Sequence, residues 1–122
     1  MAIQESGEDY LETILILREK NNLVRAIDIA NEMGYSKPSV SRAMSILKKE
    51  GYININESNY ISLTESGEEK ARGVYEKHRL LTRFFESLGV DHETAVNDAC
   101  RIEHVISPIT FEKIKQHFFL VK

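Results

Sequence analysis

The sequence predicts a mainly α-helical protein with a winged helix-turn-helix at its N-terminal end and a second, helical domain after it. Two short amphipathic helices flank Gly34, as in a helix-turn-helix. Apolar residues then alternate over residues 52–63, a period typical of a β-hairpin. From Thr64 onward they return to helical spacing. With 122 residues, the chain is expected to hold two small domains, residues 1–63 and residues 64–122.

The composition argues against a disulfide-bonded protein and against a membrane protein. The single cysteine excludes an intrachain disulfide, which fits a reducing compartment. No apolar run approaches the roughly 18 residues of a membrane span, and the first residues carry no targeting signal. A cytoplasmic protein with no membrane partner is therefore expected. The net charge is −3, but residues 24–63 hold five bases and four acids and are the only net-basic part.

The first helix is expected over residues 7–20, with Ser6 as its N-cap. Asp9 and Glu12 are three residues apart, so they share a face of this helix. Acidic residues in a first turn are also favoured by the helix dipole, which explains the pair without a ligand. The apolar stripe beside them consists of Tyr10, Leu11, Ile14, Leu15 and Leu17.

The helix-turn-helix is the most specific pattern in the chain. Its first helix ends at Gly34, which can adopt the left-handed conformation of a helix stop. Its second helix is expected to begin with Ser36 as N-cap and Pro38 in the first turn, and to continue to Gly51. The inward positions are Ile27, Ile29, Ala30 and Met33 on the first helix and Val40, Met44 and Leu47 on the second.

The outer side of the second helix carries hydroxyl and basic side chains. In this motif the second helix lies in the major groove of DNA, where Arg42 can reach a guanine edge in bidentate fashion. Lys48 and Lys49 are candidates for phosphate contacts. The predicted DNA-binding residues are Ser36, Lys37, Pro38, Ser39, Ser41, Arg42, Lys48 and Lys49. An ordinary solvated face, and a winged helix that binds only protein, are the alternatives.

The wing is expected to follow the second helix directly. Residues 52–56 and 60–63 alternate in polarity, and residues 57–59 supply the turn. Residues 23–25 are a candidate third strand.

The C-terminal half is predicted to hold three helices, which begin after Thr64, near Asp91 and at Ser107 with Pro108. The apolar positions of the first are Ala71, Val74, Tyr75, Leu81 and Phe85, with His78 among them, and those of the last are Ile109, Phe111, Ile114, Phe118 and Phe119. Three helices cannot cover so much apolar surface alone, so a homodimer interface is expected here. A lone histidine in such a stripe, as at His78, is more often a core residue than a ligand.

Cys100, Glu103 and His104 form the main candidate for a metal site. Residues spaced i, i+3 and i+4 on a helix point the same way. Thiolate, carboxylate and imidazole suit a divalent cation such as Fe(II), Zn(II), Co(II) or Mn(II). Three ligands do not complete a site, and a partly buried cysteine beside a solvated Glu-His pair is the alternative.

Over nearly its whole length the chain resembles the diphtheria toxin repressor family of metal-dependent transcriptional regulators, which includes iron-dependent repressors and manganese transport regulators. The matching segments are residues 8–14, 28–47, 63–67, 77–81 and 97–107. The resemblance implies a homodimeric regulator, usually a repressor, that senses Fe(II) or Mn(II) and binds a palindromic operator in double-stranded DNA. It also implies that residues 64–122 form an α-helical metal-binding and dimerisation domain.

Carried over by position, the resemblance implies the metal ligands Asp9, Glu12, His78, Cys100, Glu103 and His104. Asp9 replaces the Met common in the iron branch, and Cys100 replaces the Glu of the manganese branch. Thr82 and Val96 stand where the iron branch has ligands of an ancillary site, so the resemblance does not imply that site in its iron-branch form. It leaves open one ion per subunit or a manganese-type pair of adjacent ions. Zn(II), Co(II) or Ni(II) are expected to bind in vitro. Because the chain ends at Lys122, the SH3-like domain of the iron branch is expected to be absent.

An enzyme is the competing class, since Cys100 with His104 could support thiol chemistry or hold a catalytic zinc. The sequence contains no oxyanion loop and no Gly-rich phosphate cradle. Neither catalytic activity nor a small-molecule substrate is therefore expected.

Overall fold

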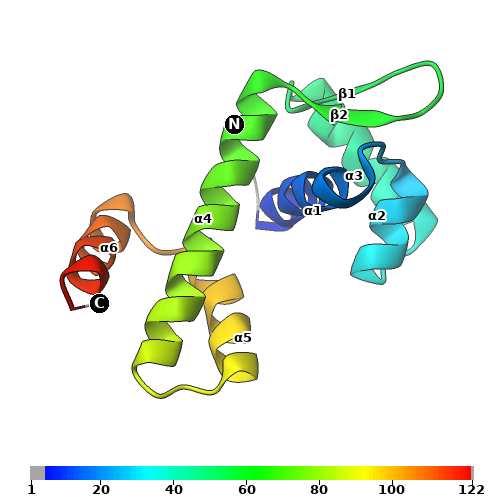
Figure 1. Cartoon of the computed structure of the whole chain (residues 1–122). Helices are drawn as coiled ribbons and strands as arrows, with labels where there is room; N and C mark the ends of the chain where they lie inside the picture. The colour runs from blue at the N-terminus through cyan, green and yellow to red at the C-terminus, as the bar shows by residue number, and fades with distance from the viewer. Residues whose placement is uncertain (1–4, 122) are drawn as a thin grey trace. The chain divides into compact units, whose positions relative to one another are not determined.

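The computed structural model describes residues 5–121, and the side chains of residues 7–118. The chain divides into two compact units, Met1–Arg72 and Gly73–Lys122, and each is described by itself. The elements in chain order are α1 (Glu5–Asn21), α2 (Ala26–Met33), α3 (Lys37–Lys49), β1 (Ile53–Ile55), β2 (Ile61–Leu63), α4 (Glu65–Ser87), α5 (His92–Ile102) and α6 (Pro108–Val121) (Figure 1). The predicted order of a winged helix-turn-helix followed by helices is confirmed.

The first unit is built around α1, which packs against α2, α3 and β2. The predicted apolar stripe of α1 is buried, and Leu11 and Ile14 are at most 1% exposed. The helix begins at Glu5, so Ser6 lies within it and is not its N-cap, contrary to the prediction. Ser6 is followed three residues later by the acidic Asp9, a spacing that resembles a capping box, and this resemblance placed the predicted start of the helix too late.

The helix-turn-helix forms as predicted at its turn. Gly34 ends α2 in the left-handed conformation, with φ 72° and ψ 25°. Ser36 caps α3, and its hydroxyl oxygen accepts a hydrogen bond of 3.3 Å from the Ser39 N–H. Ile27 was predicted to face inward, but it is 37% exposed while Ile29 is buried. Side chains two positions apart on an α-helix point in directions that differ by about 200°, so Ile27 and Ile29 cannot both face the core.

The wing is an antiparallel hairpin in which Ile53 pairs with Leu63 and Ile55 with Ile61. The candidate third strand is reduced to one bridge. Ile61 N–H donates a hydrogen bond of 2.7 Å to the carbonyl of Val24. This single bridge brings the α1–α2 connection onto the edge of the wing without forming a ladder.

The first turn of α4 is joined to the residues that follow α3. The Thr64 hydroxyl donates a hydrogen bond of 2.7 Å to the carbonyl of Gly51, and the Ser66 hydroxyl lies 3.1 Å from the same oxygen. A Cβ atom on Gly67 would lie only 1.9 Å from the carbonyl oxygen of Tyr52. This close approach requires glycine at position 67.

In the second unit, the later part of α4 packs with α5 and α6. Its buried cluster consists of Leu80, Leu81, Ala99, Phe111 and Phe118. The predicted helix starts are confirmed, since Asp91 accepts a hydrogen bond from Thr94 N–H at 3.0 Å and Ser107 accepts one from Thr110 N–H at 3.1 Å. Ile109, predicted only as apolar, is 75% exposed. The side chain of Phe119 lies outside the described residues.

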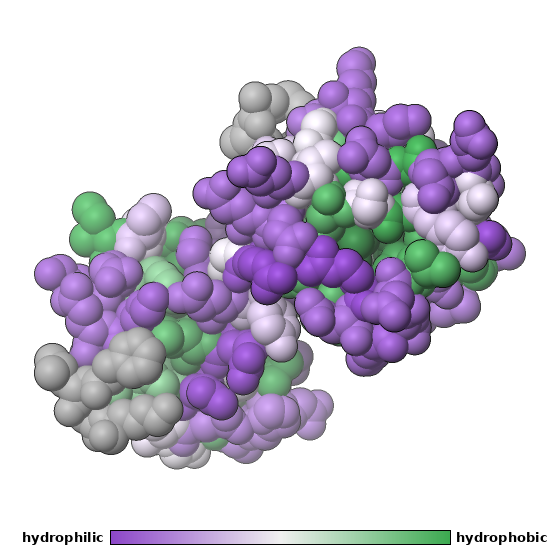
Figure 2. Space-filling model, turned by 45° about the horizontal axis from the view of Figure 1, so that its top comes forward, coloured by the Kyte–Doolittle hydropathy of each residue, from purple (hydrophilic) through white to green (hydrophobic). Residues whose placement is uncertain are grey.

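On the face in Figure 2, hydrophilic side chains predominate, with smaller hydrophobic patches between them. Among the described residues, no helix is both long and apolar enough to span a bilayer.

Candidate metal centre and DNA-binding helix

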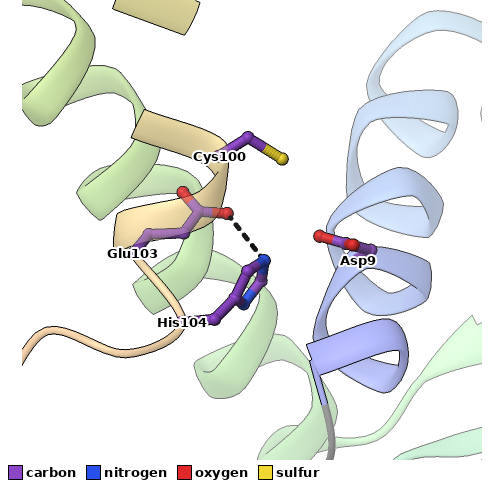
Figure 3. A group of neighbouring side chains, drawn as sticks. All are labelled: Asp9, Cys100, Glu103 and His104. Carbon is purple, nitrogen blue, oxygen red and sulfur yellow. Dashed lines mark ion pairs between the residues drawn. The ribbon is translucent and has the colours of Figure 1, made fainter. Parts of the chain in front are cut away.

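Three potential metal ligands gather where α5 ends. Cys100 lies in the last turn of α5, but the helix stops at Ile102, so Glu103 is its C-cap and His104 lies beyond it. The prediction that all three lie within one helix is therefore wrong by two residues. Glu103 nevertheless keeps helical backbone angles, φ −58° and ψ −27°, so the side chains converge. One ligand atom from each lies within 4.8 Å of the others (Figure 3).

Burial of this cluster favours a cation. Glu103 is only 4% exposed, and the side chain of His104 is 2% exposed. His104 Nε2 lies 3.4 Å from Glu103 Oε1, the ion pair that is dashed in Figure 3. Withdrawing a carboxylate from water is costly unless positive charge faces it. Carboxylate, imidazole and the half-buried thiol of Cys100 are a donor set that fits a divalent transition metal.

His78 adds a fourth potential ligand from α4. Its ring nitrogen and a carboxylate oxygen of Glu103 lie within 4.8 Å of each other. The hydroxyl of Thr82 donates a hydrogen bond of 2.7 Å to the His78 carbonyl, one turn back along the helix. The structure therefore places His78 beside the cluster at the end of α5, within the same compact unit.

Asp9 and Glu12 belong to α1 in the first unit. Since α1 begins at Glu5, both residues lie beyond its first turn, where the helix dipole favours acidic residues little. Glu12 is 8% exposed, although a solvated position would suit a carboxylate better. The dipole explanation is therefore weak for this pair, which leaves a ligand role open to it.

The predicted DNA-binding residues share one exposed surface. Ser36, Lys37, Pro38, Ser39, Ser41, Arg42, Lys48 and Lys49 are all exposed. Val40, Met44 and Leu47 on the opposite side of α3 are at most 3% exposed. The fold thus keeps this surface of the second helix free of its own core, as a recognition helix requires.

One basic residue near this surface is absent from the predicted set. The Arg25 guanidinium lies over the ring of Tyr60, 4.4 Å from its centroid, next to the wing. Its position directly before α2 was visible in the sequence, but the stacking on Tyr60 depends on how the hairpin folds back.

The fold and the donor cluster define a class, the winged helix-turn-helix regulators that carry a helical metal-binding domain. Comparisons with known proteins agree. Residues 2–59 match the family described as iron dependent repressor, N-terminal DNA binding domain. Residues 64–119 match the family described as iron dependent repressor, metal binding and dimerisation domain.

Individual relatives cover most of the chain. An uncharacterised HTH-type transcriptional regulator of Methanocaldococcus jannaschii is 34% identical over 115 residues, which are 93% of this chain and 92% of the relative. The HTH-type transcriptional regulator MntR of Lysinibacillus sphaericus is 32% identical over 109 residues, 89% of this chain and 78% of that protein. The solved structure of the manganese regulator SloR superimposes with a TM-score of 0.82 at 28% identity, over 97% of this chain and 54% of SloR.

The chain belongs to the iron-dependent repressor family, whose members are metal-dependent transcriptional regulators and not enzymes. It spans about half the length of the SloR chain.

Proposed function

We propose that this protein is a metal-dependent repressor whose homodimer, loaded with Fe(II) or Mn(II), binds a palindromic operator in double-stranded DNA. The observation that supports this most is the convergence of Cys100, Glu103 and His104 within 4.8 Å in a chain that also exposes a recognition helix. Either feature alone has a simpler explanation. Together they support a DNA-binding protein under metal control.

The proposed ligands come from both compact units. They are Asp9 and Glu12 on α1, His78 on α4, and Cys100, Glu103 and His104 at the end of α5. An ion held by both groups would link the DNA-binding unit to the helical unit. Where two ions bind, Glu12 and His78 would serve mainly one, and Asp9, Cys100 and His104 the other, with Glu103 within reach of both His78 and His104.

The donor types favour Fe(II) or Mn(II). Carboxylates are hard ligands that suit Mn(II), whereas the single thiolate and the imidazoles favour the softer Fe(II). Zn(II), Co(II) and Ni(II) would bind the same residues in vitro, because affinity at such sites rises along the series from Mn(II) to Cu(II). The metal that acts in the cell is therefore set by availability as well as by affinity.

The operator would be read by the exposed surface of α3. Arg42 would recognise a guanine edge, while Ser36, Ser39 and Lys48 would position the helix on the backbone. In this proposal residues 1–63 bind DNA. Residues 64–122 bind a second copy and supply four of the six metal ligands, His78, Cys100, Glu103 and His104. Dimerisation is supported by three strongly exposed apolar side chains of the second unit, Leu88 at 66%, Val105 at 76% and Ile109 at 75%.

The proposal assigns no catalytic residue and no small-molecule substrate. Since the proposed partner of the protein is operator DNA, the proposed location of the protein is the cytoplasm.

A metal panel tests the function. Random-sequence duplexes would be enriched anaerobically with Mn(II)- or Fe(II)-loaded protein, and the selected duplex would then be titrated with Fe(II), Mn(II), Zn(II), Co(II) or chelator present. We expect at least one of Fe(II) and Mn(II) to raise DNA affinity well above its value in chelator. Equal affinity in chelator would instead indicate a metal-independent winged-helix protein, and metal-supported hydrolysis that is lost in Cys100→Ala would indicate an enzyme.

A further inference from the structure

Helix α4 contains a glycine near its middle for which the surrounding contacts give no reason. Gly73 is exposed, and a Cβ atom built on it would meet no heavy atom within 4 Å. At Gly67, in the same helix, glycine is required because an added Cβ atom would lie 1.9 Å from the Tyr52 carbonyl oxygen. Glycine lowers the equilibrium constant for forming the helix at its position roughly four- to fivefold relative to alanine. At position 73 this loss of stability is not offset by closer packing.

The part of α4 before Gly73 is held firmly to the first unit. Glu68 accepts hydrogen bonds of 2.6 and 2.9 Å from Arg18 of α1, and Arg72 lies 2.7 Å from the same carboxylate. Lys70 Nζ lies 3.5 Å from Glu8, also on α1. These contacts bind the first two turns of α4 to the helix that carries Asp9 and Glu12.

The same turns are attached to the recognition helix. Thr64 and Ser66 contact the carbonyl of Gly51, two residues after the end of α3 at Lys49. The start of α4, α1 and α3 therefore form one body.

The part of α4 after Gly73 is held by the second unit. Lys115 of α6 donates a hydrogen bond of 2.9 Å to Glu76, and the Lys77 ammonium lies 5.8 Å from the centroid of the Phe111 ring. The buried cluster begins at Leu80. Gly73 thus lies between two sets of anchoring contacts, and it is the first residue of the second compact unit.

We propose that Gly73 is the joint of α4, at which the DNA-binding unit and the helical unit change their relative arrangement. This inference rests on the proposed function, because the metal is what would select one arrangement. In an α-helix the amides of residues 74–77 donate to the carbonyls of residues 70–73. Glycine makes transient opening of these hydrogen bonds easier, so α4 can bend here while both of its ends stay packed.

Hydrogen exchange on the metal-free and DNA-free protein tests the joint directly, without relying on regulation. We expect the amides of residues 74–77 to exchange faster than those of residues 80–83 in the same helix. Gly73→Ala introduces no clash and should slow exchange at 74–77 roughly fourfold to fivefold. Equal protection of the two segments in the parent protein would overturn the proposal.

The second measurement is the ratio of DNA affinity with and without saturating Mn(II) or Fe(II), on the selected duplex. Gly73→Ala should reduce this ratio roughly threefold to fivefold, because a stiffer joint leaves fewer arrangements for the metal to exclude. An unchanged or larger ratio would contradict the joint. A parent protein with no metal dependence would contradict the proposed function instead, while hydrogen exchange would still decide on the joint.

Glu69→Gly is the matched control, since it places a glycine at another exposed position of α4, within the anchored turns. It should leave the metal-dependent ratio as in the parent. The double variant Glu69→Gly/Gly73→Ala keeps the number of glycines and should behave like Gly73→Ala. If Glu69→Gly changes the metal-dependent ratio of DNA affinities as strongly as Gly73→Ala does, this ratio depends on the stability of α4 as a whole. Gly73 would then not be the joint.

Discussion

Arg18 and Glu68 join α1 to α4 through two parallel hydrogen bonds, at 2.6 and 2.9 Å, although 50 residues separate them in sequence. Both side chains are 31% exposed. The hydrogen bond from Arg18 is the main reason why the pKa of Glu68 falls from its usual 4.5 to about 2, and Arg72 contributes as well. The pair fixes the helix that carries Asp9 and Glu12 to the start of α4.

Glu68→Gln should lower the free energy of unfolding by about 1 kcal/mol at pH 7, since a partly exposed but bidentate pair lies at the upper end of surface ion pairs. The pKa of Glu68 is lower in the folded protein than in the unfolded chain. Its stabilisation is therefore complete above about pH 4.5 and is lost as the pH falls toward about 2.

Urea unfolding of metal-free parent and variant between pH 7 and pH 3 measures this contribution. The difference between the two proteins should shrink below about pH 4.5. Glu69→Gln, at an exposed neighbouring position, is the control and should change little. A difference that does not vary with pH would show that the ion pair is not what the glutamine variant loses.

Gly67→Ala should destabilise the first unit by roughly 1 to 3 kcal/mol. The added Cβ would overlap the Tyr52 carbonyl, and relieving the overlap requires the backbone to shift. Gly73→Ala, in the same helix but in open space, should not destabilise. Thermal unfolding of both variants decides the matter. Equal losses would mean that the close approach at Tyr52 does not constrain residue 67.

Arg42→Ala should weaken binding to the selected duplex by roughly 1 to 3 kcal/mol and leave metal affinity unchanged. Lys48→Ala, at the end of α3, is the comparison. A phosphate contact there would lower affinity for all duplexes alike and flatten the salt dependence. Titrations against specific and scrambled duplexes at several salt concentrations separate the two effects. Parent-like discrimination by Arg42→Ala would exclude it from base recognition.

Cys100→Ala should lose more affinity for Fe(II) and Co(II) than for Mn(II), because a thiolate contributes most to the softer ions. The Co(II) complex of the parent should show a sulfur-to-metal charge-transfer band that the variant lacks. If the parent spectrum contains no such band, Cys100 is a structural residue and the donor set is reduced to carboxylates and imidazoles.

Local patterns predicted the first unit well because its elements are specified by short-range chemistry. The left-handed Gly34, the capping Ser36 and the alternation in the wing each depend on neighbours in sequence. The errors have the same origin. Ser6 imitates a cap, and Ile27 is apolar without facing the core.

Contacts between distant segments could not be predicted in this way. The Arg18–Glu68 pair and the approach of Gly67 to Tyr52 arise only when α1, α3 and α4 have packed. The spacing of Cys100, Glu103 and His104 correctly predicted that they converge, although the helix ends before the last two. No local pattern singled out His78 as their neighbour, since an apolar stripe is also where a core histidine would lie.

In the proposed function, metal binding and operator binding are coupled, and paired titrations of the dimer measure this coupling directly. DNA affinity is measured with saturating metal and in chelator, and metal affinity is measured with and without the selected duplex. Linkage requires the DNA-affinity ratio to equal the product of the metal-affinity ratios of all ions bound to the dimer, and typical couplings are about 1 to 3 kcal/mol, or roughly 5- to 150-fold. We predict this equality, with a DNA-affinity ratio within this range. The same DNA affinity in chelator as in metal would contradict this coupling and leave a winged-helix protein with an incidental metal site.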